Sequence, residues 1–210
     1  MKKANFFYEK KFWQKGYQVF GIDEVGRGSL AGPLVLSAVC FPQKKSKAVE
    51  NLGIADSKKL TAKKREELVK IIKRQANKIF IAKINVSYIN KYGISKAFQS
   101  GVRKLVNQMK KTNKKIFVLI DGFHVKYLKG VGLKNQKAII KGDEKSISIA
   151  AASIIAKVYR DKLMKKLAKK YPFYHFDKNK GYGTKEHIKA LKKYRQCPIH
   201  RVLFIRNSLK

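Results

Sequence analysis

Two adjacent carboxylates, Asp23 and Glu24, follow directly on an apolar segment (residues 19–22) and precede a loop in which glycines flank Arg27. This pattern predicts a strand that ends at the acidic pair. Neighbouring carboxylates repel each other unless a cation shares the site, and a divalent metal is the obvious candidate. The alternative is an Asp-Glu step in an ordinary turn. Because neighbouring strand side chains point to opposite faces, one shared site also requires a bend near Gly26 or a Glu side chain that reaches round.

The charge of the chain indicates which partners it attracts. Its 210 residues include 50 Lys and Arg against 13 Asp and Glu, a formal net charge of +37. Such a field attracts polyanions, nucleic acid first and acidic membrane surfaces second. The lysines are spread along the whole chain, however, as a lysine-biased genome would produce. Runs such as Lys165-Lys166 are also typical of a solvated helix face.

The cysteine pattern and the apolar runs indicate a compartment. Cys40 and Cys197 lie far apart, which argues against a zinc site and a disulfide framework and fits a reducing environment. Residues 1–16 lack the apolar segment of a signal peptide, and the longest apolar run, residues 34–41, is too short to cross a bilayer. We therefore expect a cytoplasmic protein without a membrane partner, and a monomer, because no heptads occur.

Strands alternate with helices along the chain, which predicts an α/β fold with crossover connections. We expect a single domain over residues 1–210, with a core of about 17–170 and a helical C-terminal segment of about 171–210. Thr61 is a candidate helix N-cap. The expected strands are residues 17–24, 32–41, 78–86, 115–120 and 138–140, and the expected helices are 61–74, 88–110 with a break at Gly93, 146–170 and 184–194.

Two further acids stand where predicted strands end. Asp121 closes the apolar run 117–120, and Asp143 follows residues 139–142 just ahead of a helix start. Loops at strand ends can gather such carboxylates, and the N–H groups of a helix start can steady an anion. Oxygen ligands without His or Cys favour Mg²⁺ or Mn²⁺ over zinc. Two such ions could activate a water molecule and stabilise the leaving oxygen of a phosphodiester.

The segment 21–33, Gly-Ile-Asp-Glu-Val-Gly-Arg-Gly-Ser-Leu-Ala-Gly-Pro, resembles the signature of bacterial ribonuclease HII, the type 2 ribonucleases H. No single motif is specific, but the series as a whole is, because it follows the family's order almost to the end of the chain. The further matching segments are residues 56–60 (Asp-Ser-Lys-Lys-Leu), 120–122 (Ile-Asp-Gly), 141–146 (Lys-Gly-Asp-Glu-Lys-Ser), 149–156, 160–161, 179–187 (Asn-Lys-Gly-Tyr-Gly-Thr-Lys-Glu-His) and 197–201 (Cys-Pro-Ile-His-Arg).

The resemblance implies a ribonuclease H-like mixed sheet flanked by helices, and a two-metal endoribonuclease. Its substrates would be the RNA strand of RNA–DNA hybrids and single ribonucleotides embedded in duplex DNA. Cleavage on the 5′ side of such a ribonucleotide would leave 3′-hydroxyl and 5′-phosphate ends. The catalytic acids, which would hold two Mg²⁺ or Mn²⁺ ions, would be Asp23, Glu24, Asp121 and Asp143.

The resemblance also implies substrate contacts. The loop of Gly26, Arg27 and Gly28 would read the ribose 2′-hydroxyl, which distinguishes RNA from DNA, because bare glycine backbone can approach a sugar closely. Tyr182 would pack on the deoxyribose that follows the ribonucleotide. Lys58 and Lys59 are candidate phosphate contacts, and Ser146, in the segment 141–146, is a candidate substrate contact.

Departures from the family pattern are few. His175 stands where a glycine is expected, and Ser29 replaces a common proline. No additional N-terminal substrate-binding domain of the ribonuclease HIII kind is expected. Asp161, inside the long predicted helix, is interpreted as an ion-pair partner rather than a metal ligand. His200 is expected to be structural or to contact phosphate, and His124 to be a solvated loop residue.

Two other classes of function remain open at this stage. A ribonuclease H-like resolvase or transposase core would share the carboxylates, but it would lack the 2′-hydroxyl loop and would cleave DNA. A non-enzymatic basic binding module would hold duplexes without cleavage and without sensitivity to EDTA. The clustered acids argue against such a module, because carboxylates repel phosphate unless metals intervene.

Overall fold

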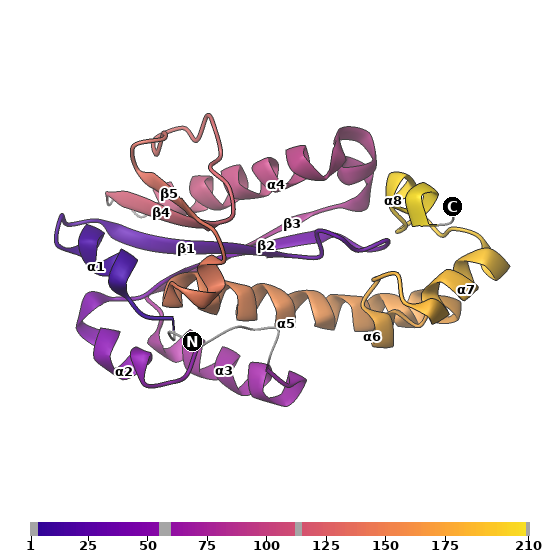
Figure 1. The fold of residues 1–210 in the computed structure, drawn as a ribbon, viewed down its shortest axis with the longest axis horizontal. Coiled ribbons are helices and arrows are strands. Elements are labelled where there is room, and N and C mark those ends of the chain that lie inside the picture. Colours follow the sequence, from indigo (N-terminus) through magenta and orange to yellow (C-terminus); the bar gives the residue numbers. More distant parts are fainter. Residues whose placement is uncertain (1–3, 55–59, 112–114, 209–210) are drawn as a thin grey trace.

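The computed structural model describes residues 4–54, 60–111 and 115–208. Among them a five-stranded mixed sheet has the order β3-β2-β1-β4-β5 (Figure 1). β1 pairs antiparallel with β2 and parallel with β4; β2 and β3 are antiparallel, and β4 and β5 are parallel. The mixed sheet and flanking helices confirm the predicted fold class. The strands are β1 (Gln18–Val25), β2 (Leu34–Cys40), β3 (Lys78–Ile84), β4 (Ile116–Asp121) and β5 (Gln136–Ile139).

Helices cover both faces of this sheet and form the C-terminal part of the molecule. The α-helices are α1 (Phe7–Trp13), α2 (Ser46–Glu50), α3 (Ala62–Gln75), α4 (Val86–Lys110), α5 (Ile147–Lys170), α6 (Phe176–Asn179), α7 (Lys185–Tyr194) and α8 (Val202–Ser208), and the 3₁₀ turns are η1 (Gln43–Lys45), η2 (Gly142–Glu144) and η3 (Pro172–Tyr174).

Alternation along β1 divides the core between the two faces of the sheet. Phe20 and Ile22 belong to the apolar cluster that includes Val102 of α4, whereas Val19 belongs to the cluster formed with α5, α3 and α1. Figure 1 shows α4 on one side of the sheet and α5 on the other. α5 packs directly on the strand backbone, since a Cβ at Gly21 would lie 2.2 Å from the Ser148 carbonyl carbon.

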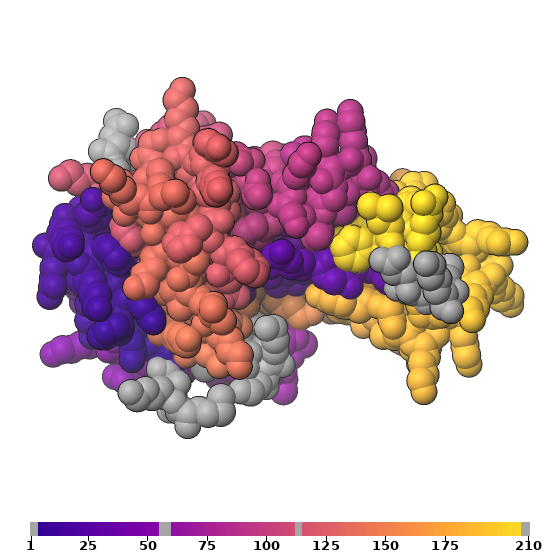
Figure 2. Space-filling model, turned by 45° about the horizontal axis from the view of Figure 1, so that its top comes forward, coloured from indigo at the N-terminus to yellow at the C-terminus, as the bar shows by residue number. Residues whose placement is uncertain are grey.

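A third apolar cluster joins the end of α5 to the C-terminal helices. Its buried members are Leu30, Ala31, Met164, Tyr174, Phe176, Ala190, Leu191 and Ile205. α7 and α8 therefore lie at the opposite end of the molecule from α1 (Figure 1). Figure 2 shows the surface narrowing between the part near residues 120–145 and the C-terminal part, with indigo atoms of the early chain at the waist.

Most predicted boundaries lie within two residues of the observed ones. Thr61 caps α3 by accepting the Lys64 N–H at 3.2 Å, and the predicted break at Gly93 is a residue with φ 80°. β5 begins two residues earlier than predicted, because Gln136 already pairs with Val118. The short helices α1 and α2 were not predicted, whereas α6 and α8 lie in the C-terminal segment that was predicted to be helical without separate bounds for them. None of the described helices is long and apolar enough to span a bilayer.

Candidate active site

The parallel pairing of β1 with β4 places Asp23 next to Asp121. Ile22 is opposite Ile120 in the register, so the following residue of each strand lies side by side on the same face. That face is the one covered by α5, from which the Ser153 side chain hydrogen-bonds the Asp23 carboxylate. Two acids about a hundred positions apart in the chain therefore meet at the carboxyl ends of two neighbouring parallel strands.

Asp23 is buried, at 6% exposure. Burial, followed by the negative charges of Glu24 and Asp121, raises its pKa well above the usual range. The Ser153 hydrogen bond and the Glu24 N–H, which donates to Asp23 Oδ1 at 2.7 Å, act in the opposite direction but do not offset the burial. Asp23 is therefore a carboxylate that lacks sufficient positive charge around it.

Glu24 points to the other face of β1, as strand alternation requires. Its Oε1 lies 3.3 Å from Nη1 of Arg27, three residues later. Burial raises the pKa of Glu24 and the charge of Asp121 adds to this, whereas Arg27 lowers it. The Arg27 guanidinium also lies over the rings of Phe98 and Phe123, at 5.4 and 5.9 Å from their centroids. Arg27 is thus the cation that accompanies Glu24.

Asp143 lies in the turn before α5, close to the carboxyl end of β4. It lies in η2 and is buried at 5% exposure. The preceding Gly142 donates its N–H to Asp121 Oδ1 at 2.7 Å, and a Cβ at Gly142 would lie 3.2 Å from that oxygen. The glycine therefore ties the turn that carries Asp143 to the end of β4. Lys141, at φ 54°, makes the left-handed bend that leads into this turn.

The four acids do not form a ready-made ligand cluster. Within the described residues, no three His, Cys, Asp or Glu side chains converge closely enough to hold one metal ion. The carboxylates of Asp23, Glu24 and Asp121 are each engaged by a protein donor instead. The donor set nevertheless fits a hard divalent cation, since all four side chains offer carboxylate oxygen and Asp23 is buried among like charges.

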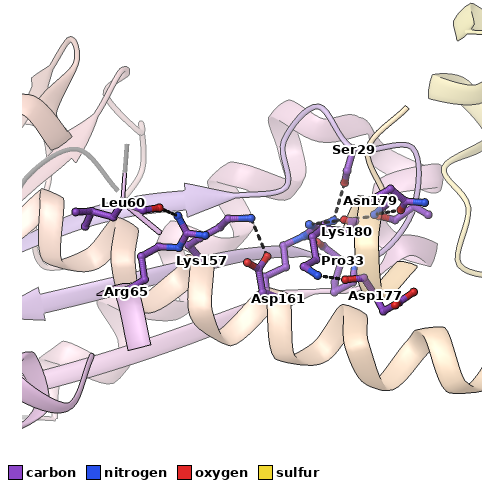
Figure 3. Close-up of polar contacts among 12 residues, drawn as sticks. Ser29, Pro33, Leu60, Arg65, Lys157, Asp161, Asp177, Asn179 and Lys180 are labelled. Carbon is purple, nitrogen blue, oxygen red and sulfur yellow. Dashed lines mark hydrogen bonds and ion pairs between the residues drawn. The ribbon is translucent and has the colours of Figure 1, made fainter. Parts of the chain in front are cut away.

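The loop after β1 is held from behind by Arg160 of α5. This residue is fully buried, and its guanidinium donates to Ser29 Oγ at 2.8 Å and to the carbonyls of Ala31 and Pro33 at 3.0 Å. A fourth bond, of 2.8 Å, reaches the Lys180 carbonyl. Figure 3 shows Ser29, Pro33 and Lys180 gathered at this point of α5. The expected substrate loop is therefore built onto the long helix.

Arg201 is a second buried cation behind the same loop. Its guanidinium donates to the Gly32 carbonyl at 2.9 and 3.0 Å and to the Arg27 carbonyl at 2.9 Å. Burial, together with the charge of Arg160, lowers the pKa of Arg201 to about 9, so the side chain is still charged at neutral pH. Neither arginine was predicted from the sequence to have this role. The match of the Cys-Pro-Ile-His-Arg segment to the family was a signal that could have pointed to Arg201. At residues 160–161, only Asp161 was interpreted.

The remaining predicted substrate residues differ in how the structure presents them. Gly28 is exposed, and Tyr182 is 37% exposed with its ring 5.5 Å from the Arg160 guanidinium carbon. Ser146 is fully buried instead: its hydroxyl accepts the Ile149 N–H as the N-cap of α5 and donates to buried Glu9 at 2.6 Å. Its observed contacts are structural, and its substrate contact stays a prediction. Lys58 and Lys59 lie outside the described residues.

The histidines and Asp161 mostly have local roles. Asp161 pairs with Lys157 at 2.8 Å on α5, as Figure 3 shows, which confirms its interpretation as an ion-pair partner. His124 is exposed and accepts the Ala138 N–H. His175 has φ 51°, a conformation that glycine adopts easily, which explains why glycine is expected there. His200 is buried rather than exposed to phosphate.

Known proteins share this fold and much of this sequence. Residues 20–207 match the family Ribonuclease HII. The chain belongs to the ribonuclease HII family. A ribonuclease HII from Caldicellulosiruptor bescii is 44% identical over 98% of this chain and 96% of its own length. One from Clostridium acetobutylicum is 48% identical over 91% of this chain and 73% of its own length.

Solved structures of this class have the same fold. The ribonuclease HII of Archaeoglobus fulgidus, determined in complex with PCNA, has a TM-score of 0.74 at 26% identity, covering 88% of this chain and 93% of its own. The ribonuclease H2 of Pyrococcus horikoshii has a TM-score of 0.73 at 27% identity, covering 91% and 96%. The ribonuclease HII family supports a hydrolytic endoribonuclease activity on RNA–DNA hybrids and a dependence on divalent metal.

Proposed function

We propose that this ribonuclease HII cuts on the 5′ side of single ribonucleotides in duplex DNA, as well as within the RNA strand of hybrids, leaving 3′-hydroxyl and 5′-phosphate ends. The observation that carries the proposal is the juxtaposition of Asp23 and Asp121 at the ends of paired strands, directly beside the Gly26–Gly28 loop. The acids that would bind metal therefore lie next to the loop that would contact the ribose.

Asp23, Glu24, Asp121 and Asp143 would hold two divalent ions, with Mg²⁺ or Mn²⁺ as the expected metals. Bound there, the ions would supply Lewis acidity toward the scissile phosphate and its leaving oxygen. The protein holds the acids on rigid elements: β1 and β4 fix Asp23 and Asp121, and Gly142 ties the turn of Asp143 to Asp121. Glu24 would have to exchange its Arg27 partner for metal, which its 3.3 Å ion pair at a half-buried position permits.

Selectivity for ribose would come from the loop and from Tyr182. Gly28 is exposed, and space for a Cβ is open around it, so its backbone is accessible to a sugar. Arg27 lies between Gly26 and Gly28 with its carbonyl bound by Arg201, which fixes the peptide planes of this stretch. The partly exposed ring of Tyr182 would pack on the following deoxyribose. Lysines such as Lys58 and Lys59 would add salt-sensitive phosphate contacts.

The test is cleavage of end-labelled duplex DNA that contains one ribonucleotide, beside an all-DNA duplex, with Mg²⁺, Mn²⁺ or EDTA. We expect one metal-dependent cut, 5′ to the ribonucleotide, and an intact control duplex. Cleavage of both duplexes would instead indicate a ribonuclease H-like deoxyribonuclease. Binding without cleavage under all three conditions would indicate a basic binding module.

A further inference from the structure

Two imidazoles are buried against each other away from the acidic site. His187 on α7 is fully buried and His200 is 2% exposed, and their Nε2 atoms lie 3.1 Å apart. The rings of Tyr174 and Phe176 pack around them. The proposed chemistry uses neither histidine, although both belong to segments that match the family.

The hydrogen bonds determine which nitrogen of each ring carries the proton. The Cys197 N–H donates to His200 Nδ1 at 2.9 Å, so this nitrogen has a free lone pair, and the longer 3.3 Å approach to the Cys197 carbonyl is not a donor contact. Neutral His200 must then carry its proton on Nε2 and donate it to His187 Nε2. His187 in turn carries its proton on Nδ1, which donates to the Tyr182 carbonyl at 2.8 Å.

The result is a chain of three hydrogen bonds, all donated in the same direction, from the Cys197 N–H through both rings to the Tyr182 carbonyl. This hydrogen-bond relay is complete only when both rings are neutral. Burial lowers the pKa of each imidazole, that of His200 to about 4, which favours the neutral forms. Either of the opposite tautomers would place two donors or two lone pairs against each other. The relay therefore has one self-consistent arrangement.

The relay ends on the backbone that presents Tyr182 and begins in the segment that supports the substrate loop. The Tyr182 carbonyl also accepts the Thr184 N–H, and its N–H donates to the Asn179 carbonyl. At the other end, His200 forms a β-bridge with Ala31, and the next residue, Arg201, donates its N–H to the Leu30 carbonyl at 2.7 Å. Both substrate-facing parts are thus attached to the same pair of rings.

We propose that His187 and His200 are positioning residues that fix Tyr182 relative to the Gly26–Gly28 loop and thereby contribute to selectivity for an RNA–DNA junction. Neither ring touches substrate. The inference rests on the proposed function, in which the Gly26–Gly28 loop contacts the 2′-hydroxyl and Tyr182 contacts the following deoxyribose. The two histidines would set the distance between these two contacts. If the two rings only fill the core, their loss will change stability but not the ratio of activities on different substrates.

The first measurement is the ¹⁵N spectrum of the imidazoles of the wild-type protein. We expect His200 as the Nε2–H tautomer and His187 as the Nδ1–H tautomer. The reverse assignment, or a charged imidazole at neutral pH, would overturn the relay. This readout depends neither on metal nor on cleavage, so it is independent of the proposed function.

The second measurement compares kcat/KM on duplex DNA with one ribonucleotide and on a continuous RNA–DNA hybrid. We expect His187→Leu to lower the ratio of the two about fivefold to tenfold, through loss of one buried hydrogen bond to the Tyr182 carbonyl. His187→Asn should restore most of the ratio, because its amide N–H occupies the position of Nδ1–H. Ile205→Ala, in the same apolar cluster, should lower stability without changing the ratio.

An unchanged ratio in folded His187→Leu would reduce the two histidines to core residues. If His187→Leu does not fold, His187→Gln takes its place, because the Gln amide occupies the position of Nε2 and leaves the Tyr182 carbonyl without this donor. An unchanged ratio in folded His187→Gln would contradict the proposal. Failure of the proposed function is a different result, because the wild-type protein would then not cut at the single ribonucleotide.

Discussion

Arg160 lies so close to Gly26 that a Cβ at Gly26 would be 2.2 Å from its Nε. The guanidinium is itself fixed by four hydrogen bonds to oxygens of residues 29–33 and 180 and cannot retreat. Gly26 also has φ 92°, a backbone conformation that other residues rarely adopt. The bend after β1 is therefore possible only for a chain with glycine at this position.

Gly26→Ala is expected to destabilise the protein by about 2 to 4 kcal/mol, because it combines a steric clash with backbone strain. Gly28→Ala is the matched control, since its Cβ would meet open space and its φ lies outside the left-handed region. Urea unfolding of both variants measures the difference. We expect Gly28→Ala to fold normally but to lose cleavage at a single ribonucleotide. Equal stability losses in the two variants would contradict the role of Arg160.

Asp121→Asn should lower cleavage by about a hundredfold or more while leaving duplex binding and fold largely intact. The amide oxygen can still accept the Gly142 N–H, and only a metal-binding charge is lost. Cleavage rates with Mg²⁺, together with circular dichroism and duplex binding, test this. Full activity of the variant would overturn the assignment of the site.

Asp23→Asn should make the metal-free protein more stable, by about 1 kcal/mol, while abolishing activity. Burial and the charges of Glu24 and Asp121 disfavour the Asp23 carboxylate, so a neutral side chain of the same shape removes that cost. Thermal unfolding in EDTA compares the two proteins. Adding Mg²⁺ should raise the melting temperature of the wild type more than that of the variant. A less stable variant in EDTA would show that Asp23 is well compensated.

Arg160→Met is expected to cost about 3 to 5 kcal/mol, because it leaves several buried carbonyl oxygens without a donor. The neighbouring Asp161→Asn provides the comparison. It removes the partly exposed ion pair with Lys157 but leaves the hydrogen bonds of Arg160 in place, and it should cost less than about 1 kcal/mol. Chemical denaturation of both variants tests the difference. A small loss in Arg160→Met would mean that the loop keeps its shape without the arginine.

Acid should destabilise the protein through His200. Its pKa is about 4 in the folded state and near 6.5 when unfolded, so between these values the unfolded chain binds the extra proton. The stabilising contribution is complete above about pH 6.5 and decreases by about 3 kcal/mol as the pH falls to about 4. Burial shifts the neighbouring His187 in the same direction.

Urea unfolding at several pH values, comparing wild type with His200→Gln, isolates this contribution. The difference in the free energy of unfolding between the two proteins should shrink as the pH falls. The carboxyl groups cancel in this comparison, since both proteins contain them. A difference that is independent of pH would mean that His200 does not titrate with folding.

The sequence was sufficient for the order of elements and for the acids because both depend on local patterns. Short apolar runs predict β1 and β4, and Thr61, Gly93 and Thr184 mark where helices begin or break. Placing Asp23 beside Asp121 needs the strand order, which a pattern within one strand does not contain. The resemblance to ribonuclease HII supplied that link.

The contacts of the arginines and histidines behind the loop could not be predicted, for a physical reason. Arg160 looks like one more charged helix residue until Pro33 and Lys180, far away in the sequence, supply its carbonyl partners. The relay from Cys197 to Tyr182 depends equally on packing of α7 against the following turn. Such roles arise only from tertiary contacts.

Arg160 and Arg201 bind the loop through neutral carbonyl and hydroxyl oxygens, so the hydrogen bonds to the loop do not neutralise their charges. The backbone of residues 26–33 therefore carries a fixed positive potential from within the protein. Buried charges are screened less by salt than exposed ones. This potential should therefore persist at ionic strengths that weaken the attraction between the surface lysines and the phosphates of a duplex. Overall affinity for a duplex would then fall with salt while its alignment on the loop is retained.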